Sequence, residues 1–147
     1  MDNLNEKVTN PNLKSAIELL KKSETKESKI LFFTELNQSR YLIPIVANSI
    51  ETDGSTEDIK KIKQGSLIKF IAVKGSDGKL ILPAFTDWDA IKKYIKQPVD
   101  VVVFEPKKIW SFVLQMGDYN GVILNPGTDN IPLEVGLIGY LNSVLYQ

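Results

Sequence analysis

Two aspartates, Asp87 and Asp89, have side chains that could do chemistry, and they directly follow an apolar run that ends at Phe85. A pair of carboxylates can act as general acid and base, or can supply oxygen ligands to a hard cation. In a helix, however, side chains two positions apart point about 200° away from each other. Aspartates in a first helical turn also interact favourably with the helix dipole. We therefore interpret both as helix-start residues, and the sequence predicts no catalytic residue and no metal ligand.

Lysines and tryptophans supply the other candidate binding groups. Lys107 and Lys108 follow Pro106 at a predicted helix start, where they could assist the binding of an anion, although exposed lysines are common. Trp88 and Trp110 could stack on a ligand, but their helical spacing from neighbouring apolar residues is more typical of core or half-buried positions.

The composition excludes several classes of enzyme. The chain contains no histidine and no cysteine, which removes imidazole bases, thiolate nucleophiles, disulfides and Cys/His zinc sites. An enzyme of this composition would depend on carboxylates, lysine, tyrosine or a metal held by oxygen. No such constellation stands out, so we expect a protein that is not an enzyme and that uses no cofactor.

Length and charge point to one ordinary globular domain. The chain has 147 residues, and we expect residues 1–147 to form a single domain. Its 18 basic and 18 acidic residues balance, and Arg40 is the only arginine, so nucleic acid is not an expected partner. The start of the chain is polar and no apolar run approaches membrane-spanning length. We therefore expect no membrane partner and a cytoplasmic location.

The candidate aspartates lie at the start of a predicted helix that directly follows a predicted strand, and the sequence predicts these two elements most clearly. Leu80 to Phe85 is apolar on both faces, which predicts a central strand covered on both sides. Thr86 fits the N-cap of a helix over Asp87 to Lys96, and Asp89 fits its capping-box partner.

Further helices and strands follow from the spacing of apolar residues and from Pro and Gly signals. Pro44 indicates an edge or irregular strand, and Ile30, Phe33 and Leu36 or Leu31 are expected to face inward. The predicted helices are about 11–22, 27–36, 106–116 and 133–145, and the predicted strands are 41–46, 67–73, 101–104 and 122–124.

These elements predict a mixed α/β fold, either α/β or α+β. Residues 75–78 join strand 67–73 to strand 79–85 as an antiparallel hairpin. From residue 79 to 124 the order is strand, helix, strand, helix, strand, which predicts a βαβαβ core with three parallel strands. We expect one mixed sheet of about five strands with helices packed on it. Residues 1–10 are expected to be loose, and residues 48–64 to form a mobile charged loop.

The carboxyl ends of three parallel strands would share one edge of the sheet. Ligands of open α/β sheets bind outside that edge. The alternative is that the residues there are helix caps and turns, with Asn125-Pro126-Gly127 as a type II turn. The candidate binding residues at this edge are Phe85, Thr86, Asp87, Trp88, Lys107, Asn125, Pro126 and Gly127.

Three segments resemble a known family. The run Leu82–Thr86, followed by Trp88–Ile91, resembles the core motif of the SseB protein N-terminal domain family. The segment Gly121–Gly127 is similar to a later motif of that family, and the helix from Glu27 with Tyr41–Ile45 is similar to its opening. Together the similar segments span roughly residues 12–145.

The resemblance implies a bacterial domain whose molecular role is unknown. The family takes its name from an enhanced serine-sensitivity phenotype and is sometimes associated with type III secretion. It supplies no catalytic residues to carry over, and its longer members continue into a second, C-terminal domain.

Two hypotheses of different kinds remain open. The first is a non-catalytic interaction module that binds a protein or peptide, for which a homodimer is one option. The second is a domain that binds a small ligand or anion at the carboxyl-end edge of the parallel strands. A deep pocket lined by Trp88 and Asn125 would favour the second, and a flat apolar patch would favour the first.

Overall fold

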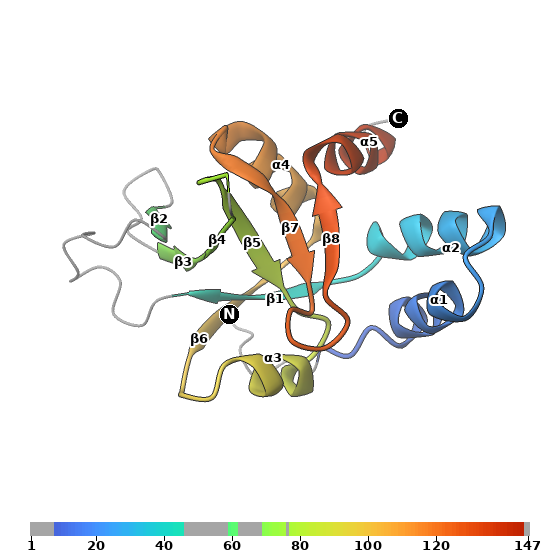
Figure 1. The fold of residues 1–147 in the computed structure, drawn as a ribbon, viewed down its shortest axis with the longest axis horizontal. Helices are drawn as coiled ribbons and strands as arrows, with labels where there is room; N and C mark the ends of the chain where they lie inside the picture. The colour runs from blue at the N-terminus through green and yellow to red at the C-terminus, as the bar shows by residue number, and fades with distance from the viewer. Residues whose placement is uncertain (1–7, 46–58, 62–68, 76, 146–147) are drawn as a thin grey trace.

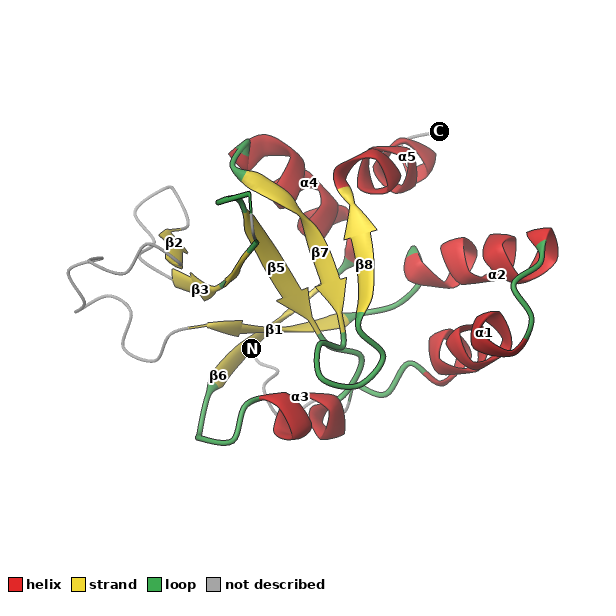
Figure 2. Cartoon of the chain, viewed as in Figure 1, coloured by secondary structure: helices red, strands yellow, loops and turns green. Residues whose placement is uncertain are grey.

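A computed structural model describes residues 8–45, 59–61, 69–75 and 77–145 (Figure 1). Within these residues the chain forms five helices and eight strands (Figure 2). The helices are α1 (Pro11–Lys22), α2 (Lys26–Leu36), α3 (Trp88–Tyr94), α4 (Pro106–Met116) and α5 (Val135–Leu145). The strands are β1 (Tyr41–Ile45), β2 (Ile59–Lys61), β3 (Lys69–Ile71), β4 (Val73–Lys74), β5 (Leu80–Ala84), β6 (Asp100–Phe104), β7 (Tyr119–Leu124) and β8 (Ile131–Glu134).

The strands form two four-stranded sheets. The first has the order β2-β3-β1-β6, and all of its pairs are antiparallel. The second has the order β4-β5-β7-β8, in which only β5 and β7 are parallel. The mixed α and β class is therefore confirmed as an α+β fold, but the expected single sheet of about five strands is wrong, because the strands divide between two sheets.

Two connections join the sheets. The predicted strand over residues 67–73 is divided at Ala72, so that β3 lies in the first sheet and β4 in the second. Leu42 of β1 and Phe85, directly after β5, exchange backbone hydrogen bonds of 2.9 and 3.0 Å. The two sheets thus meet at the point where β5 ends.

The predicted βαβαβ core with three parallel strands is wrong in one strand. β6 does not join β5 and β7, but pairs antiparallel with β1 in the first sheet. No place beside β5 is open to it, because β4 and β7 occupy the two edges of β5, and β8 takes the outer edge of β7. In its actual position β6 buries Val101 in an apolar cluster with Phe85 and Ile91.

Pro44 was predicted at an edge or irregular position, and it lies in an inner strand whose pairing is irregular on one side. Leu42 directs its backbone groups away from β6, toward Phe85. Because alternate residues of a strand direct their backbone groups to the same side, Pro44 also directs its nitrogen away from β6. The strand on that side, β3, pairs with β1 only at Ile45. The missing N–H of Pro44 therefore breaks no bond of the β1–β6 ladder.

The helices cover the second sheet and one another. α4 and α5 pack together and against β7, while α1 packs on α2. Asn37, just after α2, ties three helical elements together. Its amide donates a hydrogen bond of 3.0 Å to the Leu141 carbonyl of α5, and its oxygen accepts one of 2.8 Å from the Trp110 indole of α4.

Helix α2 faces inward differently from the prediction. Ser28, Phe32 and Leu36 are its buried residues, whereas Ile30 and Leu31 are exposed. Of the residues expected inward, only Leu36 is fully buried, and Phe33 is half-buried. A helix with apolar residues on several sides gives no clear period, so the pattern could not select the inner face.

Three other segments differ from the prediction. Residues 131–134 form strand β8, so the last helix begins at Val135 and not at Leu133 as predicted. Residues 59–61, in the predicted charged loop, form β2. The rest of that loop lies outside the described residues. In the N-terminal segment, residues 1–7 lie outside the described residues, but Val8 is buried in the cluster around Phe85.

Several local predictions are confirmed. Helix α4 begins at Pro106 and ends at Met116, and Gly117 follows as its C-cap with a φ of 78°, which suits glycine. The β4–β5 hairpin closes through a hydrogen bond of 2.8 Å from the Gly75 N–H to the Lys79 carbonyl. Asn125 begins a turn in which Gly127 has φ 91°, as a type II turn requires.

Two glycines provide a test of the β7–β8 packing. A Cβ at Gly121 (φ 151°) would lie 2.2 Å from the Leu133 carbonyl oxygen, and backbone cannot move aside easily. We expect Gly121→Ala to reduce the free energy of unfolding by about 3 kcal/mol, the upper end of the usual range for overpacking. Gly139→Ala is the matched control: it meets open space in a helix, and should stabilise by about 0.5–1 kcal/mol. Urea unfolding followed by circular dichroism measures both, and equal effects would contradict this packing.

Candidate functional site

The parallel pair β5 and β7 brings two of the predicted motifs together at its carboxyl end. The Asn125 N–H donates a hydrogen bond of 2.8 Å to the Ala84 carbonyl, which extends the ladder past the last paired strand residue. Thr86 and Asp87 therefore lie beside Asn125, as the sequence predicted. All three residues are buried.

Thr86 and Asn125 are joined by two hydrogen bonds. The Thr86 N–H donates to the Asn125 side-chain oxygen at 3.0 Å, and the Asn125 amide donates to the Thr86 hydroxyl at 3.1 Å. The same amide also donates to Asp129 at 2.8 Å. Asn125 has a left-handed backbone (φ 51°), a conformation that asparagine tolerates better than most residues. The Asn125 side chain thus bonds Thr86 at the end of β5 and Asp129 in the segment that follows β7.

Asp87, and not Thr86, caps helix α3. The Asp87 carboxylate accepts a hydrogen bond of 2.9 Å from the Ala90 N–H, which is the N-cap geometry. The prediction placed the cap one residue too early. The Thr86 hydroxyl instead donates to the other Asp87 oxygen at 2.8 Å, and Asp89 is exposed in the first turn.

The charge of Asp87 is held by its neighbours. The Lys14 ammonium of α1 lies 2.7 Å from the carboxylate. Burial acts to raise the pKa of Asp87, but the bond with Lys14 and those from the Ala90 N–H and the Thr86 hydroxyl outweigh it. The pKa of Asp87 is therefore lowered, and the carboxylate serves as a structural anion between α1 and α3.

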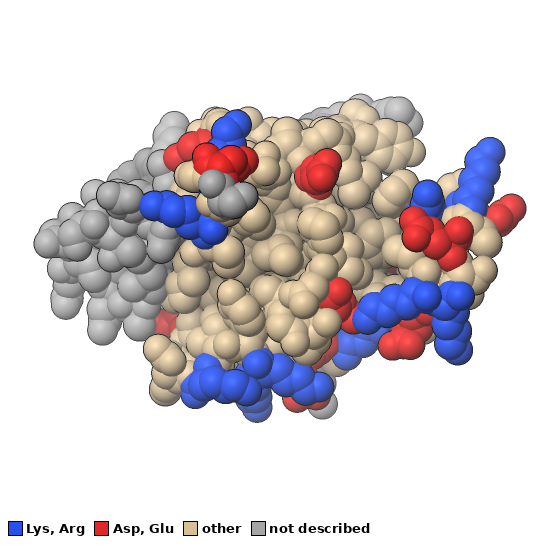
Figure 3. All heavy atoms as spheres, in the orientation of Figure 1, with Lys and Arg blue, Asp and Glu red and all other residues tan. Residues whose placement is uncertain are grey.

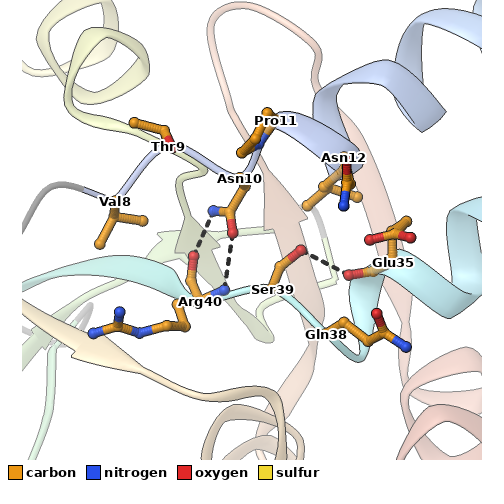
Figure 4. Close-up of a pocket in the computed structure, with 10 residues that line it drawn as sticks. Val8, Thr9, Asn10, Pro11, Asn12, Glu35, Gln38, Ser39 and Arg40 are labelled. Carbon is orange, nitrogen blue, oxygen red and sulfur yellow. Dashed lines mark hydrogen bonds between the residues drawn. The ribbon is translucent and has the colours of Figure 1, made fainter.

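Asn10 completes this polar group from the start of α1. Its side chain does not cap α1, but donates to the Thr86 carbonyl at 2.9 Å and to the Arg40 carbonyl. Its oxygen accepts from the Arg40 N–H at 3.1 Å (Figure 4). Asn10 thus links the start of β1 to the end of β5. We call Asn10, Thr86, Asp87 and Asn125 the polar junction.

Two hollows border the polar junction. One, of about 270 Å³, includes Asn10 and lies between residues 8–13 and 35–40 (Figure 4). The other, also about 270 Å³, is lined by Thr86, Asp87 and Asn125. Its other lining residues are mostly polar or charged, with more carboxylates than lysines: Lys14, Ile17, Glu18, Asp89, Ala90, Lys93, Thr128 and Asp129.

The remaining predicted site residues do not line the second hollow. Phe85 and Pro126 are buried, and the Phe85 ring packs against Tyr94 with centroids 5.9 Å apart. Trp88 is half-buried against the Phe85 cluster. Gly127 is exposed, and a Cβ there would lie 3.1 Å from the Tyr94 ring.

Lys107 is separated from the other candidates because β6 belongs to the first sheet. It is exposed in the first turn of α4 and lines neither hollow. The predicted meeting of three strand ends at one edge is therefore reduced to two, those of β5 and β7.

Three members of this arrangement, Asn10, Lys14 and Asp129, were not predicted as site residues. Lys14 pairs with Asp87, and Asp129 pairs with Lys21 and accepts from Asn125. Apart from the bond between Asn125 and Asp129, the contacts of these residues join distant parts of the chain, so spacing could not reveal them.

A different surface, between α2 and α5, is apolar. Phe33 and Tyr140 contact edge to face, with ring centroids 6.3 Å apart. Beside them lies a groove of about 260 Å³, which we call the α2–α5 groove. None of its lining residues is charged: Ile30, Phe33, Thr34, Asn37, Gln38, Tyr140, Leu141, Val144 and Leu145. The exposed fractions of Ile30 and Tyr140 are 54% and 55%, although both side chains are large and apolar.

The amino-acid sequence that forms this α+β fold matches the model of one known family. The model of the SseB protein N-terminal domain matches residues 13–138, which is most of the chain. The chain therefore belongs to the family of SseB protein N-terminal domains. No curated protein and no solved structure matches it.

Membrane-spanning helices and metal-binding groups can be assessed for the part of the chain that the structure describes. In that part, no helix has both the length and the apolar character needed to cross a membrane. The same residues contain no group of three or more acidic, histidine or cysteine side chains able to hold a metal ion.

The polar junction predicts a large structural effect at Asn125. Asn125→Ala leaves the buried Thr86 N–H without an acceptor and puts alanine in a left-handed conformation. We expect the free energy of unfolding to fall by about 2–4 kcal/mol. Asn130→Ala is the control, because Asn130 has the same backbone conformation (φ 53°) but is exposed, and its side chain accepts a hydrogen bond from the exposed Gly127 N–H rather than from a buried one. Chemical denaturation measures both, and an equal loss for the two variants would show that the buried bonds contribute nothing.

The lowered pKa of Asp87 predicts how stability depends on pH. A carboxyl whose pKa is lower in the folded state stabilises the fold above its unfolded pKa, and loses that contribution as pH falls through the folded value. Asp87→Asn keeps a capping side chain but removes the charge. We expect the wild type to be more stable than this variant at pH 7, and the difference to shrink as pH falls below about 4. Unfolding curves at several pH values test this, and a constant difference would contradict it.

Proposed function

We propose that this domain is a non-catalytic protein-interaction module that contacts its partner through the α2–α5 groove. The observation that carries the proposal is an uncharged groove flanked by the exposed apolar side chains of Ile30 and Tyr140. Such a groove is a typical docking surface for an apolar segment of another protein. As the sequence led us to expect, the proposed setting is the cytoplasm of a bacterial cell.

The polar junction supports a structural role rather than catalysis. The Thr86, Asp87 and Asn125 side chains are engaged with one another, with Lys14 and with the backbone. A general base or nucleophile has to present such groups to a substrate. Here the same groups stabilise the ends of two strands and the start of a helix.

The alternative of anion binding at the strand ends is less well supported. The hollow there is lined by four carboxylates and two lysines, Lys14 and Lys93. One of these lysines is already paired with Asp87. An anion would therefore meet more negative than positive charge, whereas the α2–α5 groove has no charge to overcome.

The proposal predicts that one groove substitution removes binding of a protein partner. Ile30→Glu places a charge at the groove without disturbing a buried residue. With the wild-type domain immobilised, cross-linking in a bacterial lysate should capture one or more proteins that the Ile30→Glu domain loses at least tenfold. Leu19→Glu is the control, because Leu19 of α1 is similarly exposed (44%) but lies outside the groove. Equal capture by both variants would refute the groove as the surface that binds another protein.

A further inference from the structure

We propose that the occupant of the α2–α5 groove is a second copy of this chain, which docks through its own α5. This inference rests on the proposed function and names its partner. In a symmetric dimer the same surface of each copy forms both halves of the interface, so that surface has to complement itself. The α2–α5 surface has the shape and the charge that this condition requires.

The shape is complementary because a groove and a ridge lie side by side. The groove of about 260 Å³ has α2 on one side and α5 on the other. Tyr140 and Val144 project from α5 at its border, with exposed fractions of 55% and 38%. A twofold axis near the middle of α5 would place the ridge of each copy in the groove of the other. The Tyr140 side chains of both copies would then lose their contact with water.

The charge of α5 permits self-association, because the helix has no charged residue that would repel its copy. None of its eleven residues is acidic or basic, and on the side of the molecule seen in Figure 3 no charged side chain lies over α5. Lysines and acidic residues gather instead over α1, α2 and α3. When a helix faces its own copy, each charge would meet a like charge near the axis. An uncharged helix avoids this repulsion, whereas a charged partner would find no counter-charge on it.

The glycines of α5 agree with close approach by another helix. A Cβ at Gly136 or Gly139 would meet nothing within 4 Å, so no contact inside the chain requires glycine there. Gly136 lies in the first turn of α5, but Gly139 lies inside the helix, where glycine costs about 1 kcal/mol relative to alanine. Close packing of a second helix against the glycine backbone would offset that cost.

The absence of cysteine makes a direct test possible. In a cysteine-free chain, Ser143→Cys introduces a single thiol on the exposed face of α5. Treatment with a short bismaleimide should convert most of this variant to a covalent dimer. Ser15→Cys, exposed on α1, is the matched control and should remain mainly monomeric. Equal cross-linking of the two variants, or none of either, would overturn the inference.

Sedimentation of the untreated chain supplies a second readout. The wild type should pass from monomer to dimer between ~1 µM and ~1 mM, the range of a small interface. Tyr140→Glu places like charges on both copies and should weaken association at least ~10-fold, while Leu19→Glu should not. Circular dichroism checks that each variant is folded. A dimer unaffected by Tyr140→Glu would show that the contact lies elsewhere, and would overturn the inference.

The two proposals fail in different ways. A wild type that stays monomeric, but captures another protein in a manner that depends on Ile30, would refute the second copy and keep the groove as an interaction surface. A dimer that depends on Tyr140, together with capture unaffected by Ile30→Glu, would keep the self-association and refute a further protein partner at the groove.

Discussion

The fold depends on the backbone N–H and carbonyl groups of Thr86. Thr86 is fully buried, yet its N–H and its carbonyl are each bonded to an asparagine side chain, Asn125 on one side and Asn10 on the other. Without these partners, two backbone polar groups would be left unsatisfied in the interior. The two asparagines come from opposite ends of the chain. The start of α1, the end of β5 and the end of β7 therefore all have to meet at Thr86.

This constraint explains why a distinctive sequence motif need not be a binding motif. Thr86 and Asn125 belong to the segments that resemble the family, and their side chains satisfy the backbone and one another. A buried polar group of this kind specifies one arrangement of the strands, because any other arrangement leaves donors unpaired. The motif can thus identify the family through its fold, without itself being the surface that we propose for a partner.

Local signals in the sequence were sufficient for much of the fold. Helix α4, the β4–β5 hairpin and the turn after Asn125 each depend on a few neighbouring residues, and each was predicted. The partner of β6 depends on which strand edges are already taken, and no local pattern records that. The cap of α3 was misplaced by one residue because Thr86 and Asp87 are both good capping residues. Only the contact with Asn125, 39 positions away, decides between them.

The same difference between local and distant information explains the missed groove. Helix α2 buries Ser28, Phe32 and Leu36, and still carries Ile30 on its outer surface. In sequence such a helix has no clear polar face, which is typical of a helix that is covered on more than one side. Among the described residues, α2 packs against α1, and Ile30 remains exposed beside the uncharged helix α5. This exposed apolar surface is the reason for placing the proposed partner at the α2–α5 groove. Polar contacts thus define the fold, whereas the proposed interaction depends on apolar helix surfaces.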